Sequence, residues 1–132
     1  MPLVDANIFL YNLTKSPKRE FEVSQRILQR IEDGEEAFTT TLIVQEVADW
    51  LEYNGRRQAV PTFVASVNSY GKLRKVEGFW ADMVHANDFM KEFQLSFVDV
   101  VSIAIMERIG EKQVYSNDLD FDRVKWIERI FK

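Results

Sequence analysis

Short apolar runs recur along the chain, and longer segments with helical spacing lie between them. Apolar runs of this length are typical of strands that are buried on both faces of a parallel sheet. The pattern predicts strands at residues 2–4, 37–39, 73–76 and 113–116, and a fifth within 124–130. Strands that alternate with helices imply an α/β protein in which helices cover both faces of a parallel sheet.

The expected helices are marked by capping residues and by apolar positions three and four residues apart. Ser16 is expected to cap a helix whose first residue is Pro17 and which closes at Asp33 and Gly34. Residues 8–11, just after the first strand, are expected to form an apolar turn. Further helices are expected from Thr40 or Thr41 to Asn54 and Gly55, over 56–70 with Pro61 dividing it, over 81–93, and from Ser96 to Arg108.

The composition fits one soluble domain. The chain has 132 residues, 46% of them hydrophobic, so residues 1–132 are expected to form a single domain with a substantial core. The first residues do not resemble a signal peptide, and no later apolar run approaches ~18 residues. We therefore expect a cytoplasmic protein with no membrane role. The lack of cysteine excludes disulfides, thiolate metal sites and cysteine nucleophiles.

Four carboxylates stand against apolar runs: Asp5, Glu46, Asp99 and Asp118. Burying an ionised carboxylate without a partner is so costly that four such cases suggest a shared cation. Because the chain has no cysteine and one histidine, oxygen atoms dominate the metal ligands that it offers. The expected ion is therefore a hard one, Mg²⁺ or Mn²⁺.

The placement of these acids predicts that they converge. Asp5 and Asp118 follow predicted strands, whereas Glu46 and Asp99 lie in the early turns of predicted helices. Sites in parallel α/β sheets form beyond the carboxyl ends of the strands, where all four could meet. Three of the acids also have an ordinary interpretation: Asp99 can belong to a helix-capping box, Asp118 can be a turn residue, and Glu46 can lie on a solvated helix face. Asp5 is harder to explain in this way, because apolar residues precede and follow it.

The net charge of −4 argues against a protein that holds nucleic acid by phosphate neutralisation alone. The four acids account for the whole excess of 21 acidic over 17 basic residues. A carboxylate-rich metal site on an otherwise neutral protein would give this balance.

Four segments, in this order, resemble the PIN-domain nucleases, among which small chains are mostly VapC-type toxins. The segments are residues 4–9, 44–46, 95–104 and 115–122. The resemblance implies a three-layer α/β/α sandwich on a short, mostly parallel sheet. It also implies a metal-dependent endoribonuclease that uses Mg²⁺ or Mn²⁺. Residues 56–93 show no clear match, so the resemblance does not identify the substrate contacts.

The resemblance assigns catalysis and metal binding to the four acids named above, and it adds Asp120 as an auxiliary acid. Ser116 and Asn7 match polar positions that support the site. The implied partners are RNA, a small antitoxin protein and a second copy of the chain. Aromatic residues beyond the needs of one core also favour a homodimer: Trp50, Tyr53, Phe79 and Trp80.

Two alternatives remain open within the family: an endonuclease for RNA processing and a non-catalytic module that binds RNA or protein. A phosphoryl-aspartate protein is disfavoured on two grounds. Asn7 stands where haloacid-dehalogenase-like phosphatases have a second aspartate, and Lys112 precedes the late strand that the lysine of a response-regulator receiver follows. His85, the only histidine, is expected to be a surface or partly packed residue.

Overall fold

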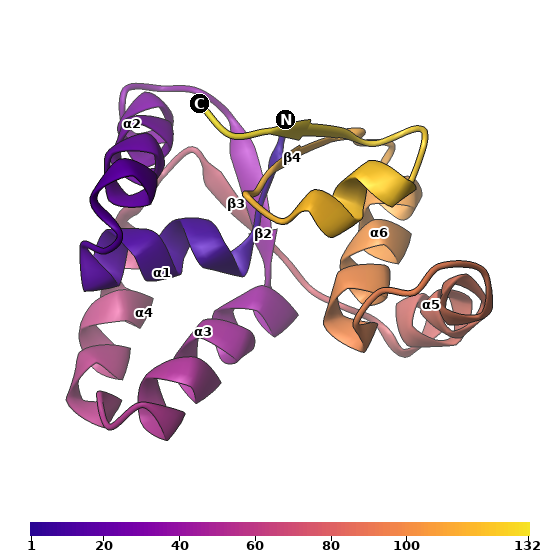
Figure 1. Cartoon of the computed structure of the whole chain (residues 1–132), viewed down its shortest axis with the longest axis horizontal. Helices are drawn as coiled ribbons and strands as arrows, with labels where there is room; N and C mark the ends of the chain where they lie inside the picture. The colour runs from indigo at the N-terminus through magenta and orange to yellow at the C-terminus, as the bar shows by residue number, and fades with distance from the viewer.

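A five-stranded, entirely parallel sheet runs through the middle of the protein (Figure 1). The computed structural model describes all residues, 1–132. The strand order is β3-β2-β1-β4-β5, so the first strand is the central one. The strands are β1 (Leu3–Val4), β2 (Ala37–Thr40), β3 (Leu73–Val76), β4 (Gln113–Tyr115) and β5 (Glu128–Ile130). All five predicted strands are therefore confirmed.

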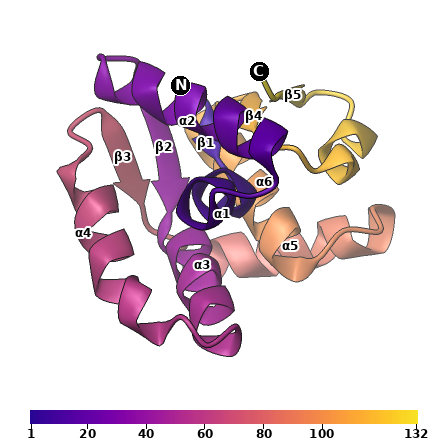
Figure 2. The same cartoon turned by 60° about the vertical axis from the view of Figure 1, so that its left-hand side comes forward.

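Helices cover both faces of the sheet and complete a three-layer α/β/α arrangement. The α-helices are α1 (Ala6–Thr14), α2 (Lys18–Glu32), α3 (Thr41–Tyr53), α4 (Val60–Ser69), α5 (Trp80–Glu92) and α6 (Phe97–Ile109). Two short 3-10 helices are η1 (Arg57–Ala59) and η2 (Leu119–Arg123). Helices α1 to α4 lie on one side of the strands and α5, α6 and η2 on the other (Figure 1). Figure 2 shows the same layers with α1 and α2 in front of the strands.

Right-handed crossovers explain why the helices divide in this way. The chain moves from β1 to β2 to β3 in one direction along the sheet, so α1 to α4 share a face. It then crosses back to β4 and continues to β5, which puts α5, α6 and η2 on the opposite face. The strand order reverses between β1 and β4. Ligand sites of open α/β sheets lie at such a reversal, beyond the carboxyl ends of the strands.

The core fills the space on both sides of β1 and β2. Every residue of these two strands is buried, as expected for strands that have helices on both faces. Helix α6 is unusual because its residues 100–106 are all buried. A helix that is apolar all round needs neighbours on every side, and α6 lies between the sheet and α5. This burial fixes the position of the first turn of α6.

Two predictions about the start of the chain are wrong. Residues 8–11 do not form a turn but belong to α1, which begins at Ala6 because the carboxylate of Asp5 caps it. Pro17 is not the first residue of α2 but its N-cap, with an extended backbone, and Ser16 lies outside the helix. Neither side chain accepts a hydrogen bond from the first N–H groups of α2, so the helix begins without a side-chain cap.

The segment from 56 to 70 is helical, as predicted, but Pro61 does not divide it. The division falls earlier, where η1 gives way to α4 at Val60. Pro61 lies in the first turn of α4, where its missing N–H costs no hydrogen bond. No helix in the structure has both the length and the apolar character needed to cross a membrane.

Candidate metal centre

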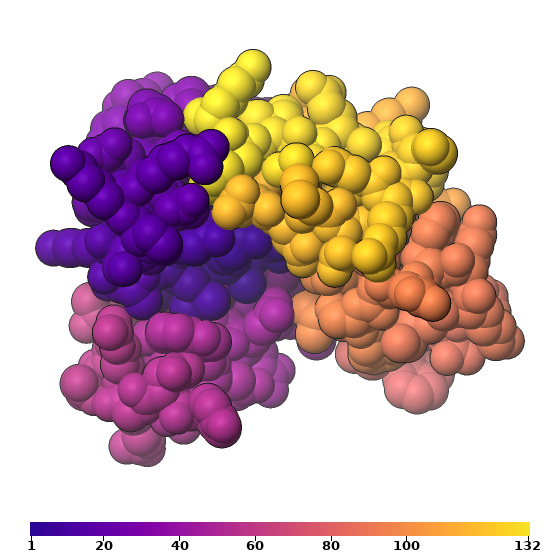
Figure 3. Space-filling view, viewed as in Figure 1, coloured from indigo at the N-terminus to yellow at the C-terminus, as the bar shows by residue number.

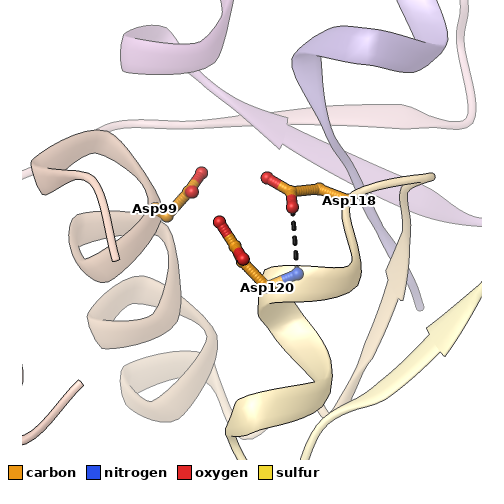
Figure 4. Close-up of side chains that lie close together, drawn as sticks. All are labelled: Asp99, Asp118 and Asp120. Atoms are coloured by element: carbon orange, nitrogen blue, oxygen red, sulfur yellow. Dashed lines mark hydrogen bonds between the residues drawn. The ribbon is translucent and has the colours of Figure 1, made fainter. Parts of the chain in front are cut away.

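Three aspartates meet beyond the carboxyl ends of the strands. Asp99 lies in the first turn of α6, Asp118 caps η2, and Asp120 follows in η2. One carboxylate oxygen from each lies within 4.8 Å of those of the other two. Figure 4 shows the three carboxylates turned toward one another. The sequence predicted Asp99 and Asp118 as principal acids, but the structure gives Asp120 an equal place beside them.

Local hydrogen bonds hold two of these aspartates in position. The N–H of Asp99 donates to the Ser96 side chain at 3.2 Å, so Ser96 caps α6. The Asp99 carboxylate takes no part in this bond and is turned toward the other acids (Figure 4). One oxygen of Asp118 accepts the N–H of Asp120 at 2.9 Å, as the dashed line in Figure 4 marks. Helix capping therefore accounts for Ser96 but not for the direction of the Asp99 carboxylate.

Asp5 is buried at the end of β1, where several donors fix its carboxylate. Its Oδ1 accepts the N–H of Ala6 at 2.9 Å. Its Oδ2 accepts the hydroxyl of Ser116 at 2.7 Å and the amide of Asn7 at 3.3 Å. The Ser116 hydroxyl oxygen in turn accepts the N–H of Asp118 at 3.0 Å. Ser116 thus connects the two acids at the strand ends.

Asn7 connects α1 to the loop after β4. Its amide donates to the Ser116 hydroxyl at 3.0 Å, and its carbonyl oxygen accepts the N–H of Asn117 at 3.2 Å. Asn117 also donates to the hydroxyl of Tyr11 at 3.1 Å. The structure therefore brings both predicted supporting residues, Asn7 and Ser116, into direct contact with Asp5.

Glu46 approaches the other acids from α3. Its Oε2 is buried and has no hydrogen-bond partner in the protein. Burial raises the pKa of Glu46, and the negative charges of Asp99 and Asp118 raise it further. A buried carboxylate oxygen without a donor is costly, so Glu46 is suited to a cation that the protein itself does not supply.

Burial and like charge also raise the pKa values of two aspartates. Burial is the main cause for Asp5, whose pKa lies at about 6 despite its bonds from Ser116 and Ala6. Burial is again the main cause for Asp99, whose pKa lies at about 7, and the nearby charges of Asp5, Asp118 and Asp120 add to it. Both carboxyl groups therefore keep their protons to a higher pH than a free aspartate does, because no cationic side chain offsets their charge.

We refer to five carboxylates as the acidic cluster: Asp5, Glu46, Asp99, Asp118 and Asp120. Only one ion pair in the structure involves a member of it, between Asp120 and Arg123 at 3.4 Å. Arg123 is not among the residues predicted from the sequence, although its spacing three residues after Asp120 permits the pair. Five carboxylates and one arginine leave an excess of negative charge with oxygen ligands. This donor set fits Mg²⁺ or Mn²⁺.

None of the other candidate residues makes a side-chain hydrogen bond or an ion pair with a member of the acidic cluster. Three of the four aromatic residues suggested for an interface are exposed, namely Tyr53, Phe79 and Trp80. Trp50 instead packs partly against the core. His85 is half exposed and pairs with Glu107 at 3.0 Å, which agrees with its predicted surface role.

Solved structures share this fold along nearly their whole length. The crystal structure of VapC20 from Mycobacterium tuberculosis, described as a toxin that cleaves the sarcin-ricin loop, matches with a TM-score of 0.83 and 18% identity over 100% of both chains. The crystal structure of VapBC2 from Rickettsia felis, bound to a DNA fragment from its own promoter, matches with a TM-score of 0.73 and 10% identity. A toxin-antitoxin complex from Klebsiella pneumoniae matches with a TM-score of 0.66 and 13% identity. Each of these last two matches covers 97% of this chain and 96% of the other.

No curated protein sequence matches the chain significantly. The sequence model of the PIN domain matches residues 3–127, a range that contains the whole acidic cluster. The resemblance read from the four sequence segments is thereby confirmed, as is the sandwich fold that it implied. The chain belongs to the PIN domain family.

Proposed function

We propose that the chain is a metal-dependent endoribonuclease that acts as the toxin of a toxin–antitoxin pair. The observation that carries this proposal is the acidic cluster at the strand reversal, with raised pKa values for Asp5 and Asp99 and an unpartnered oxygen on Glu46. A nuclease needs such a cation site because phosphodiesters are themselves anionic.

In this proposal Asp5, Asp99 and Asp118 hold one or two Mg²⁺ or Mn²⁺ ions. Glu46 completes the site directly or through water, and Asp120 assists. When bound there, such an ion would supply Lewis-acid chemistry, which lowers the pKa of a water molecule and polarises the scissile phosphate. Ser116 and Asn7 act by keeping Oδ2 of Asp5 in place through their hydrogen bonds. In-line attack by water would leave 5′-phosphate and 3′-hydroxyl ends.

The toxin role is supported by the full-length fold likeness to VapC20, described as a toxin that cleaves the sarcin-ricin loop. We propose single-stranded or structured RNA as the substrate, since basic patches suited to duplex DNA are sparse. The proposed antitoxin is a small protein whose flexible arm places a basic side chain among the carboxylates of the cluster. A second copy of the chain is the other proposed partner.

The nuclease proposal is tested by replacing Asp99 with Asn, which removes one charge and keeps the side-chain volume. Asp99→Asn should abolish Mn²⁺-dependent cleavage of RNA while its thermal midpoint stays at or above that of the wild type. EDTA should abolish cleavage by the wild type. Asp88→Asn, which changes an exposed acid on α5, is the matched control and should cleave normally.

Cleavage by folded Asp99→Asn at the wild-type rate would reject the metal-dependent nuclease. Expression in cells tests the toxin role separately. The wild type should arrest growth, and the product of an adjacent small gene should co-purify with it and restore growth. If RNA is cleaved but growth is unaffected, the RNA-processing alternative replaces the toxin.

A further inference from the structure

Arg123 lies at the edge of the acidic cluster, in the last position of η2. Its Nη2 is 3.4 Å from Oδ1 of Asp120. Its Nη1 donates to the backbone carbonyl of Gln94 at 2.6 Å, in the connection between α5 and α6. Two separate contacts, one within η2 and one with a distant segment, therefore hold the guanidinium in place.

An ordinary surface ion pair does not explain both contacts. Pairs three residues apart on a helix are common and contribute little, and nothing fixes their geometry. The carbonyl of Gln94 fixes Arg123 against another element, 29 residues away in the sequence. The side chain nevertheless remains 50% exposed. A guanidinium has five N–H donors, so several of them are free to bind an incoming group.

The chemistry of an RNA substrate gives these free donors a role. Every nucleotide next to the scissile bond brings another phosphate toward a cluster that is already negatively charged. Arginine binds phosphate oxygens in a fixed fork geometry, and this arginine is the one cation paired with the cluster. We propose that Arg123 binds the RNA phosphate adjacent to the scissile one while it partly neutralises Asp120.

This proposal rests on the proposed nuclease function and adds a substrate contact to it. It predicts that RNA binding and metal binding respond differently when the guanidinium is removed. RNA should bind more weakly because a phosphate contact is lost. Divalent metal should bind equally well or more tightly, because the charge of Asp120 is no longer partly neutralised. A purely structural role for Arg123 would weaken both kinds of binding.

The test compares Arg123→Gln with the wild type as full-length proteins. Calorimetric titration with MnCl₂ measures metal affinity without RNA, and cleavage of a labelled hairpin RNA with a single-stranded loop measures KM and kcat. Arg123→Gln should raise KM about tenfold, the loss expected for charge-assisted hydrogen bonds to phosphate. Its Kd for Mn²⁺ should be equal to or below that of the wild type. The slope of log KM against log salt should fall by roughly 0.7, the value of one phosphate contact on a single strand.

Two further variants complete the test. Arg123→Lys keeps the positive charge but loses the planar pair of N–H donors. Its KM should lie between those of the wild type and Arg123→Gln. Arg57→Gln removes an exposed arginine whose ion pair is with Glu52, at 3.9 Å. It should change neither KM for RNA nor Kd for Mn²⁺. Weaker Mn²⁺ binding or an unchanged KM in Arg123→Gln overturns the proposal for Arg123. Absence of cleavage by the wild type instead overturns the proposed nuclease.

Discussion

Individual acids show that partners, rather than burial alone, set their charge. Asp82 and Asp5 are almost equally buried, at 4% and 5% exposed. Burial raises the pKa of Asp82. Hydrogen bonds from Arg108 and from the Phe79 N–H lower it, as does the positive charge of Arg108, and together they outweigh burial, so the net shift is downward. Asp5 has no cationic partner, and its pKa rises to about 6. Asp82 therefore has a cationic partner within the protein, whereas Asp5 has none.

This contrast predicts how stability depends on pH without metal. Acids whose pKa is raised by folding bind protons in the folded state at a pH where the unfolded chain has released them. With pKa values of about 6 for Asp5 and about 7 for Asp99, the free energy of unfolding in EDTA should rise as pH falls from 8 to 5. The gain should be on the order of 1–3 kcal/mol.

Urea denaturation at pH 8 and pH 5 measures this difference. Asp99→Asn cannot titrate at that position and should show a clearly smaller gain. Adding Mn²⁺ should stabilise the wild type more at pH 8 than at pH 5, because protons compete with the ion for the same oxygens. A wild-type protein that is more stable at pH 8 than at pH 5 in EDTA would contradict the assignment of raised pKa values.

At the level of elements, residues 116–122, which run from just after β4 into η2, carry two of the acids and are held from β5. Arg129 donates to the carbonyl of Ser116 at 3.3 Å, just before the acids. It also donates to both carboxylate oxygens of Asp122 at 3.1 and 3.2 Å, just after them. The Arg129 side chain is only 18% exposed. These three bonds fix both ends of the segment that presents Asp118 and Asp120.

Replacing Arg129 with Lys should therefore loosen this segment, because one ammonium cannot span both partners. The expected cost is about 1.5–3 kcal/mol in the free energy of unfolding, together with weaker Mn²⁺ binding. Chemical denaturation and calorimetric titration measure the two effects. Arg19→Lys, a change at an exposed residue of α2, serves as the control and should leave both unchanged. Full metal affinity in Arg129→Lys would show that the acids do not depend on this support.

Particular elements show what the sequence could and could not predict. The buried strands and α6 were found because apolar runs and the Ser96 cap are local signals. Helix α1 was missed because Asp5 was considered only as a candidate site residue, whereas its carboxylate also caps this helix. The four acids were recognised by their apolar surroundings. The contact between Arg123 and Gln94 could not be foreseen, because it depends on how η2 packs against a distant connection.

At the scale of the whole molecule, several large aromatic side chains are exposed. Tyr53 at the end of α3 is 91% exposed, and Trp80 at the start of α5 is 78% exposed with Phe79 beside it. Figure 3 shows the surface indented between the α3–α4 side and the α5–α6 side of the molecule. Large exposed aromatic side chains are the residues most enriched in protein interfaces. They support the proposed homodimer.

Light scattering at micromolar concentration should therefore give twice the mass of one chain. Trp80→Ser should raise the dimer dissociation constant at least about tenfold, which is the usual loss when an interface aromatic is truncated. Val64→Ser changes an exposed apolar residue of α4 and should leave the mass unchanged. A wild-type protein that remains monomeric under these conditions would exclude the dimer.

The central place of β1 in the sheet has a consequence for the timing of synthesis. Asp5 is translated 111 residues before Ser116, and it meets Ser116 and Asp118 only after β4 has been translated and has paired with β1. A chain still growing on the ribosome therefore lacks the acidic cluster until β4 and η2 have both been made. If the protein is the proposed toxin, its nascent chains are harmless, and the cell is exposed to the nuclease only once a complete fold exists for an antitoxin to bind.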